Sequence, residues 1–177
     1  MSDRQFFELQ GRTIEFAAEG KGPALALVVD QGADLDALAT LSHLVSQADF
    51  RIVRIQTHNA EDVFDILDHL DIASAWIGGH GRGGVTARAA AAAHHERVNG
   101  VLLLGVEAHA TALPEGIPVL VVQASDDDVT PPANGEALQN SAPGLVSIVT
   151  VEGAGHRFPE THAGETAWAI EDYLDWD

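Results

Sequence analysis

The chain has 177 residues and a mass of 18.7 kDa, the length of one domain with a substantial core. Its 27 acidic and 9 basic side chains give a formal net charge of −18 at pH 7, so its surface repels nucleic acid and anionic lipid. The absence of cysteine excludes disulfides, thiolate metal sites and a thiol nucleophile. The sequence shows no apolar signal core and no run of membrane-spanning length. We therefore expect one domain over residues 1–177 in a cytoplasmic protein.

Short apolar runs alternate with amphipathic stretches along the chain. Two runs on either side of a turn at Gly11-Arg12 predict an opening β-hairpin. The predicted strands cover residues 6–9, 13–17, 24–29, 51–55, 73–77, 98–104, 119–123 and 145–151. The predicted helices cover residues 35–48, a segment capped by Asn59 that reaches Leu70, an alanine-rich segment that ends near His94, residues 134–140 and residues 164–176.

This order of elements predicts the fold class. Strands that alternate with helices form parallel βαβ units with helices on both faces of the sheet. We therefore predict a three-layer α/β fold with a mostly parallel sheet and an antiparallel hairpin at its N-terminus. Ligands of such sheets bind beyond the carboxyl ends of the strands. Three of these ends carry glycine-rich or polar segments, namely residues 79–84 (GHGRGG), 124–132 (ASDDDVTPP) and 153–156 (GAGH).

Together the three segments resemble the α/β-hydrolase family, and the resemblance extends over nearly the whole chain. In that family a G-x-S-x-G motif presents the nucleophile at a strand-to-helix turn, and an acid and then a histidine follow along the chain. The resemblance implies that Gly81 stands at the nucleophile position, Asp127 at the acid and His156 at the base. It also implies a fold without a cap domain, because only residues 106–117 join two strands where larger members carry the cap.

The chain departs from the family pattern at Gly81, because glycine has no nucleophilic atom. The resemblance still implies that Asp127 orients His156, and that the backbone N–H of Arg82 forms half of an oxyanion hole, with Gln31 or Ala33 as the second donor. We therefore predict an α/β-hydrolase-like protein of esterase-like ancestry with little or no serine-hydrolase activity. We expect a small ester-like ligand or a protein partner, no cofactor, no metal ion, no nucleic acid and no membrane, and we leave open a homo-oligomer.

Two other functions stay open. In the first, the His156–Asp127 pair acts as a general base on water or substrate, without a covalent step, in a hydrolase or lyase. In the second, Gly79, Gly81 and Gly84 form a G-x-G-x-x-G loop between a strand and a helix, which is typical of nucleotide-binding proteins, and Glu107 follows the next strand as the ribose-binding acid.

Overall fold

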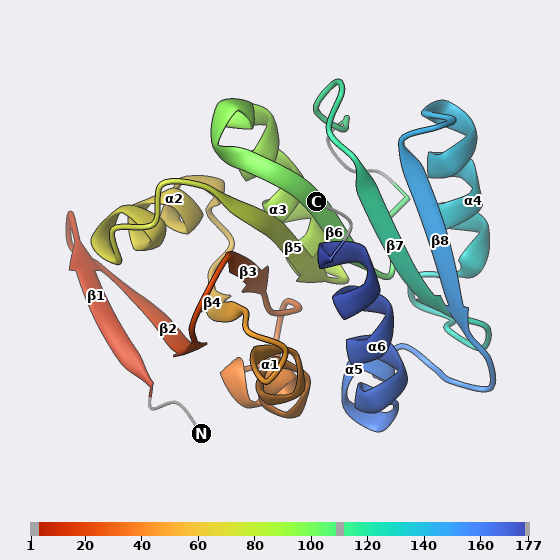
Figure 1. The fold of residues 1–177 in the computed structure, drawn as a ribbon, viewed down its shortest axis with the longest axis horizontal. Coiled ribbons are helices and arrows are strands. Elements are labelled where there is room, and N and C mark those ends of the chain that lie inside the picture. Colours follow the sequence, from red (N-terminus) through yellow and green to blue (C-terminus); the bar gives the residue numbers. More distant parts are fainter. Residues whose placement is uncertain (1–3, 109–111, 176–177) are drawn as a thin grey trace.

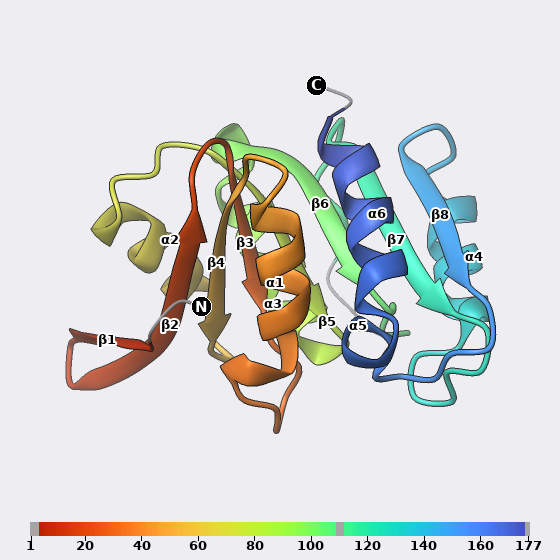
Figure 2. The same cartoon turned by 60° about the horizontal axis from the view of Figure 1, so that its bottom comes forward.

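The structure is a computed structural model of the chain, and it describes residues 4–108 and 112–175. Within these residues the strands form one eight-stranded mixed sheet in the order β1-β2-β4-β3-β5-β6-β7-β8 (Figures 1 and 2). The strands are β1 (Gln5–Leu9), β2 (Arg12–Gly20), β3 (Ala24–Val28), β4 (Arg51–Gln56), β5 (Ala75–His80), β6 (Val98–Leu104), β7 (Val119–Ala124) and β8 (Val146–Val151).

The N-terminal part of the sheet is antiparallel and the rest is parallel. Strands β1 and β2 form the predicted hairpin, and β2 pairs antiparallel with β4. Strands β4, β3, β5, β6, β7 and β8 then follow one another in parallel. The turn of the hairpin is Gln10-Gly11 rather than Gly11-Arg12, because Gln10 and Gly11 are the residues with positive φ, at 52° and 80°.

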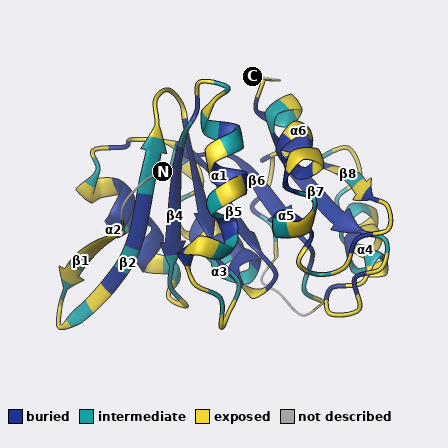
Figure 3. Cartoon of the chain, turned by 90° about the horizontal axis from the view of Figure 1, so that it is seen from below, coloured by how far each residue is buried: buried dark blue, intermediate teal, exposed yellow. Residues whose placement is uncertain are grey.

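The central strands are buried along their whole length. Every residue of β3, β5 and β7 is buried (Figure 3). Helices cover both faces of this part of the sheet, so its strands are continuous apolar runs instead of alternating ones.

The helices form the two outer layers. They are η1 (Leu35–Leu38), α1 (Ala39–Ser46), α2 (Ala60–His69), α3 (Arg82–Ala93), η2 (His95–Arg97), α4 (Pro132–Ser141), α5 (Phe158–Thr161) and α6 (Ala163–Leu174). Helices α1 and α6 lie on one face of the sheet, and α2, α3 and α4 lie on the other (Figures 1 and 2). One hydrophobic cluster joins Leu41 of α1 and Ile170 of α6 to the sheet, and a second joins Leu67 of α2 and Ala90 of α3 to it. The predicted three-layer arrangement is confirmed.

Two predicted elements need correction, and one helix was missed. The helix predicted over residues 35–48 begins as the 3₁₀ turn η1 and continues as α1. The strand predicted over residues 73–77 runs from Ala75 to His80, so Gly79 and His80 of the 79–84 segment belong to β5. Helix α5 was not predicted, because four residues are too few to show a helical period. The closing helix is confirmed to Leu174, and the predicted end at Trp176 lies outside the described residues.

The connection between β6 and β7 is short. Its described parts, residues 105–108 and 112–118, contain no helix. The carboxyl ends of the strands therefore carry no cap, as predicted. None of the helices in the described ranges is both long and apolar enough to cross a membrane.

Candidate functional site

Four loops meet at the carboxyl ends of the parallel strands. They follow β3, β5, β7 and β8, and they bring together Asp30, Gly81, Asp127 and His156. Three of these residues are the predicted nucleophile position, acid and histidine, whereas Asp30 was not predicted. We call these four residues the Asp30–His156 cluster.

The glycines of the 79–84 segment have a steric role. A Cβ atom at Gly79 would lie 2.3 Å from the carbonyl carbon of Gly83, and one at Gly83 would lie 2.3 Å from the carbonyl oxygen of Val28. The first turn of α3 therefore packs directly on the backbone of β3 and β5. Gly81, at the apex of the turn, has φ 55° and ψ −120°, a conformation that is strained for any residue with a side chain.

The Asp127 carboxylate is fixed by its own loop and faces His156. It accepts hydrogen bonds from the backbone N–H groups of Val129 and Thr130, each at 2.9 Å, and from the Thr130 hydroxyl at 2.6 Å. Its Oδ2 lies 3.1 Å from Nδ1 of His156. Burial alone would raise the pKa of Asp127, but the hydrogen bonds from Thr130, His156 and Val129 outweigh it and hold the pKa below its usual value. The loop therefore presents an ionised acceptor to the imidazole.

Asp30 holds the other side of the imidazole. Its Oδ2 lies 2.7 Å from Nε2 of His156. Its Oδ1 accepts the backbone N–H of Gln31 at 2.8 Å and that of Arg82 at 3.0 Å. These are two of the three predicted oxyanion-hole donors. The third, the N–H of Ala33, donates to the backbone carbonyl of Asp30 at 3.0 Å and does not join them.

The Asp30 carboxylate also fills the space beside Gly81. A Cβ atom at Gly81 would lie 2.7 Å from Oδ1 and 2.8 Å from Oδ2 of Asp30, closer than real Cβ contacts allow. A side chain at position 81 and the present position of Asp30 therefore exclude each other.

The two carboxylates make His156 a cation. The hydrogen bond with Asp30 is the largest cause, and together with Asp127 it outweighs burial and raises the pKa of His156 to about 9. For Asp30, burial acts to raise the pKa, but the hydrogen bonds with His156 and with the Arg82 N–H lower it below its ordinary value. At neutral pH the site therefore consists of an imidazolium between two carboxylates.

His80 supports the ring of His156 from below. The two imidazoles stack with their centroids 4.6 Å apart, and Nε2 of His80 lies 2.7 Å from the carbonyl oxygen of His156. The ring of Phe158 packs edge-on to the ring of His80, with the two centroids 5.8 Å apart. Burial lowers the pKa of His80 and keeps it neutral. His80 is thus a packing partner of the cluster.

A metal ion could be considered at Asp30, His80 and His156, whose ligand atoms lie within 4.8 Å of one another. Imidazole binds metals through a lone pair in the plane of its ring. The two rings here are stacked at 25° to each other, so their lone pairs do not converge on one point. This arrangement disfavours a three-ligand site at these residues.

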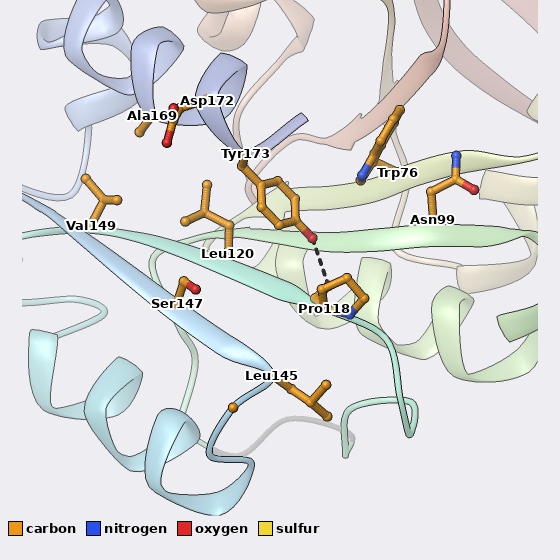
Figure 4. Close-up of a pocket in the computed structure, with 11 residues that line it drawn as sticks. Trp76, Asn99, Pro118, Leu120, Leu145, Ser147, Val149, Ala169, Asp172 and Tyr173 are labelled. Carbon is orange, nitrogen blue, oxygen red and sulfur yellow. Dashed lines mark hydrogen bonds between the residues drawn. The ribbon is translucent and has the colours of Figure 1, made fainter. Parts of the chain in front are cut away.

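A separate cavity of about 380 Å³ lies at the opposite ends of the strands (Figure 4). Trp76 and Pro118 on the sheet side and Tyr173 of α6 line it, and the Tyr173 hydroxyl donates to the Pro118 carbonyl at 2.8 Å. It contains none of the predicted site residues, so we do not include it in the candidate site.

The pattern of the Alpha/beta hydrolase family matches residues 27–162. The structure of a predicted CIB-like hydrolase from Thermoplasma acidophilum is 17% identical, with a TM-score of 0.82 over 98% of both chains. A thermophilic esterase from Thermogutta terrifontis is 17% identical, with a TM-score of 0.83 over 99% of this chain and 98% of its own. Est1E from Butyrivibrio proteoclasticus is 12% identical, with a TM-score of 0.79 over 97% of both. The predicted hydrolase-like fold without a cap is confirmed by these structures.

Proposed function

Because this chain belongs to the alpha/beta hydrolase family, we propose that it is a member whose nucleophile has been lost at Gly81 and whose serine-hydrolase activity is absent or very low. The structural neighbours include a thermophilic esterase from Thermogutta terrifontis, which supports an esterase-like ancestry. In this proposal position 81 carries no nucleophilic atom, and the space that a nucleophilic side chain would need is filled by the carboxylate of Asp30.

The observation that carries the proposal is the pair of hydrogen bonds that Asp30 accepts. Acyl transfer needs backbone N–H groups aimed at the oxygen that becomes negative in the transition state. The N–H groups of Gln31 and Arg82 are suited to this task, but both are directed at Oδ1 of Asp30. An ester carbonyl that entered the site would have to displace a carboxylate from them. The chain therefore lacks both the attacking atom and a free oxyanion hole.

The general-base alternative requires a neutral imidazole. With the pKa of His156 raised to about 9, about one molecule in a hundred carries the neutral ring at pH 7. Nε2, which would have to activate water, is hydrogen-bonded to Asp30. Activity by this route would appear only at alkaline pH, so we rank it second.

The nucleotide-binding alternative requires the phosphate of the nucleotide to bind at the N-terminus of α3. That is where a phosphate would bind in a dinucleotide-binding protein, and the carboxylate of Asp30 already accepts the N–H of Arg82 there. The close approach of Gly79 to the backbone of Gly83 accounts for Gly79, one of the three glycines of the motif, without a ligand. We rank nucleotide binding third.

The proposal is tested with short p-nitrophenyl esters and a fluorophosphonate probe, using the parent chain and a His156→Ala variant across the neutral and alkaline range. We expect no labelling, and no hydrolysis at neutral pH above that of the variant. Hydrolysis at neutral pH that disappears in His156→Ala would overturn the proposal. Hydrolysis that appears only as the pH approaches about 9, the pKa of His156, and disappears in the variant, would favour the general-base alternative.

A further inference from the structure

A second cavity lies beside α3 and does not contain the Asp30–His156 cluster. Its volume is about 260 Å³, and it lies between α3, the end of β6 and α4. Its lining includes Arg88, Val106, Glu107, Asn134, Ala137 and Leu138. We call it the Arg88 pocket.

Arg88 is a buried cation that has no counter-charge among the residues that the structure describes. Its residue is 6% exposed, and its Nε is fully buried with no hydrogen-bond partner. No hydrogen bond or ion pair joins its guanidinium to any residue of the described ranges 4–108 and 112–175, and burial lowers its pKa with no carboxylate to oppose the effect. The other deeply buried arginine, Arg54, donates from Nη1 to the Leu35 carbonyl at 2.6 Å. Because burying an unpaired charge is strongly unfavourable, Arg88 needs an acceptor.

The neighbouring polar group on α4 does not supply that acceptor. The side-chain amide of Asn134 donates to the Val106 carbonyl at 2.8 Å and thereby ties α4 to the end of β6. The rest of the lining is mixed: Val106, Ala137 and Leu138 contribute an aliphatic patch, and Glu107 and Ser141 contribute polar surface. The pocket therefore offers one strong, unmet donor group beside an aliphatic surface.

We propose that the Arg88 pocket binds a short-chain aliphatic monocarboxylate, with its carboxylate on the guanidinium of Arg88 and its alkyl chain against Val106, Ala137 and Leu138. A guanidinium presents parallel N–H groups that match the two oxygens of a carboxylate. Glu107 lines the same pocket without forming an ion pair with Arg88, and its charge would repel a second negative group on the ligand. A singly charged acid is therefore favoured over a dicarboxylate or phosphate, and the volume suits a chain of few carbons.

This site does not depend on the proposed loss of hydrolase activity. A narrow void bounded by Gly81, Gly84 and Val85 also reaches Arg88, but it is too small to hold a water molecule. A ligand in the Arg88 pocket would thus not enter the Asp30–His156 cluster. Binding in the pocket and ester hydrolysis can be measured separately, and one can fail while the other holds.

To test this proposal, the full chain is titrated separately with butyrate, succinate and inorganic phosphate, and binding is measured by NMR and calorimetry. We expect saturable binding of one butyrate per chain, and binding of succinate and phosphate weaker by about tenfold or more. Arg88→Gln, which removes the charge at similar size, should weaken butyrate binding by about tenfold or more. Glu107→Gln should strengthen it. Arg157→Gln is the matched control, because Arg157 is an exposed arginine paired with Glu160, and this variant should bind like the parent.

A further variant protects the test against misfolding of Arg88→Gln. Ala137 lies on the exposed side of α4, so Ala137→Trp can fill the pocket without altering Arg88, and it should also abolish butyrate binding. The proposal is overturned if the folded parent binds no butyrate, if folded Arg88→Gln or Ala137→Trp binds it as well as the parent does, or if phosphate binds more tightly than butyrate.

Discussion

Oδ2 of Asp30 lies 2.7 Å from Nε2 of His156, while Nδ1 of the same ring faces Asp127 at 3.1 Å. In a serine hydrolase the atom beside Nε2 is a hydroxyl oxygen, which gives its proton to a neutral imidazole. Here it is a carboxylate oxygen, which has no proton to give and which favours the charged ring. The contact that holds His156 in place therefore also favours the protonated ring, which cannot accept a proton.

Removal of the Asp30 charge should lower the pKa of His156. In Asp30→Asn the largest cause of the raised pKa is lost, and only Asp127 still favours the imidazolium. We expect the pKa to fall from about 9 by about one unit or more, as measured by NMR titration of the ring nitrogens. Asp126→Asn is the control, because it removes an exposed charge from the neighbouring position in sequence to Asp127. An equal pKa in parent and Asp30→Asn would show that Asp30 does not face the ring in solution.

The raised pKa of His156 also predicts how stability changes with pH. A histidine whose pKa is higher in the folded than in the unfolded chain stabilises the fold fully below its unfolded pKa, near 6.5. That stabilisation is lost as the pH rises through the folded pKa of about 9, and it amounts to at most about 3 kcal/mol. Urea unfolding between these two pH values should therefore show a falling free energy of unfolding.

Asp30→Asn provides the comparison for this pH dependence. Since the folded pKa of His156 is lower in the variant, its stability should fall less over the same pH range. A parent whose stability is constant across the range, or a variant that loses as much as the parent, would contradict the ion-paired site.

Gly83 is predicted to be required for the contact between α3 and β3. A Cβ atom there would lie 2.3 Å from the carbonyl oxygen of Val28 and 2.5 Å from that of Val29, and backbone atoms of a central strand cannot move aside cheaply. Gly83→Ala should lower the free energy of unfolding by about 3 kcal/mol or more, as measured by urea unfolding. Gly164→Ala is the control, because a Cβ at Gly164 of α6 meets nothing within 4 Å. It should leave stability unchanged or raise it by up to about 1 kcal/mol.

The difference in stability between the two glycine variants tests whether the first turn of α3 lies on β3. If Gly83→Ala were as stable as Gly164→Ala, the first turn of α3 would not lie on β3 as described, and the steric explanation of the glycine run would be wrong.

Much of the fold was predictable because the central sheet is parallel. Buried strands such as β3 and β7 are unbroken apolar runs, and turn residues bound them. The start of the first helix was not predicted correctly, because leucines at Leu35, Leu38 and Leu41 repeat every third residue. That spacing fits the 3₁₀ turn η1 as well as one face of an α-helix.

The site was predictable only in part. Asp127 and His156 follow their strands in segments with a known order along the chain, so their proximity could be expected. The role of Asp30 depends on its distance from Gly81, which is set by the packing of the first turn of α3 on β3 and not by any local pattern. The available signal was its place at the end of the first parallel strand, directly before Gln31, where ligands of such sheets bind.

Our central claim is that the carboxylate of Asp30 fills the space that a serine at position 81 would need. The same carboxylate also accepts the N–H groups that would stabilise the oxyanion of the substrate. This claim is tested most directly by measuring p-nitrophenyl acetate hydrolysis in Gly81→Ser, in Asp30→Ala and in the double variant. A serine introduced alone would collide with Asp30, whereas Asp30→Ala frees the N–H groups of Gln31 and Arg82 and leaves His156 paired with Asp127. We predict that the double variant hydrolyses the ester, that His156→Ala abolishes this activity, and that both single variants are inactive. Hydrolysis by Gly81→Ser as fast as by the double variant would contradict the claim, as would a folded double variant without activity.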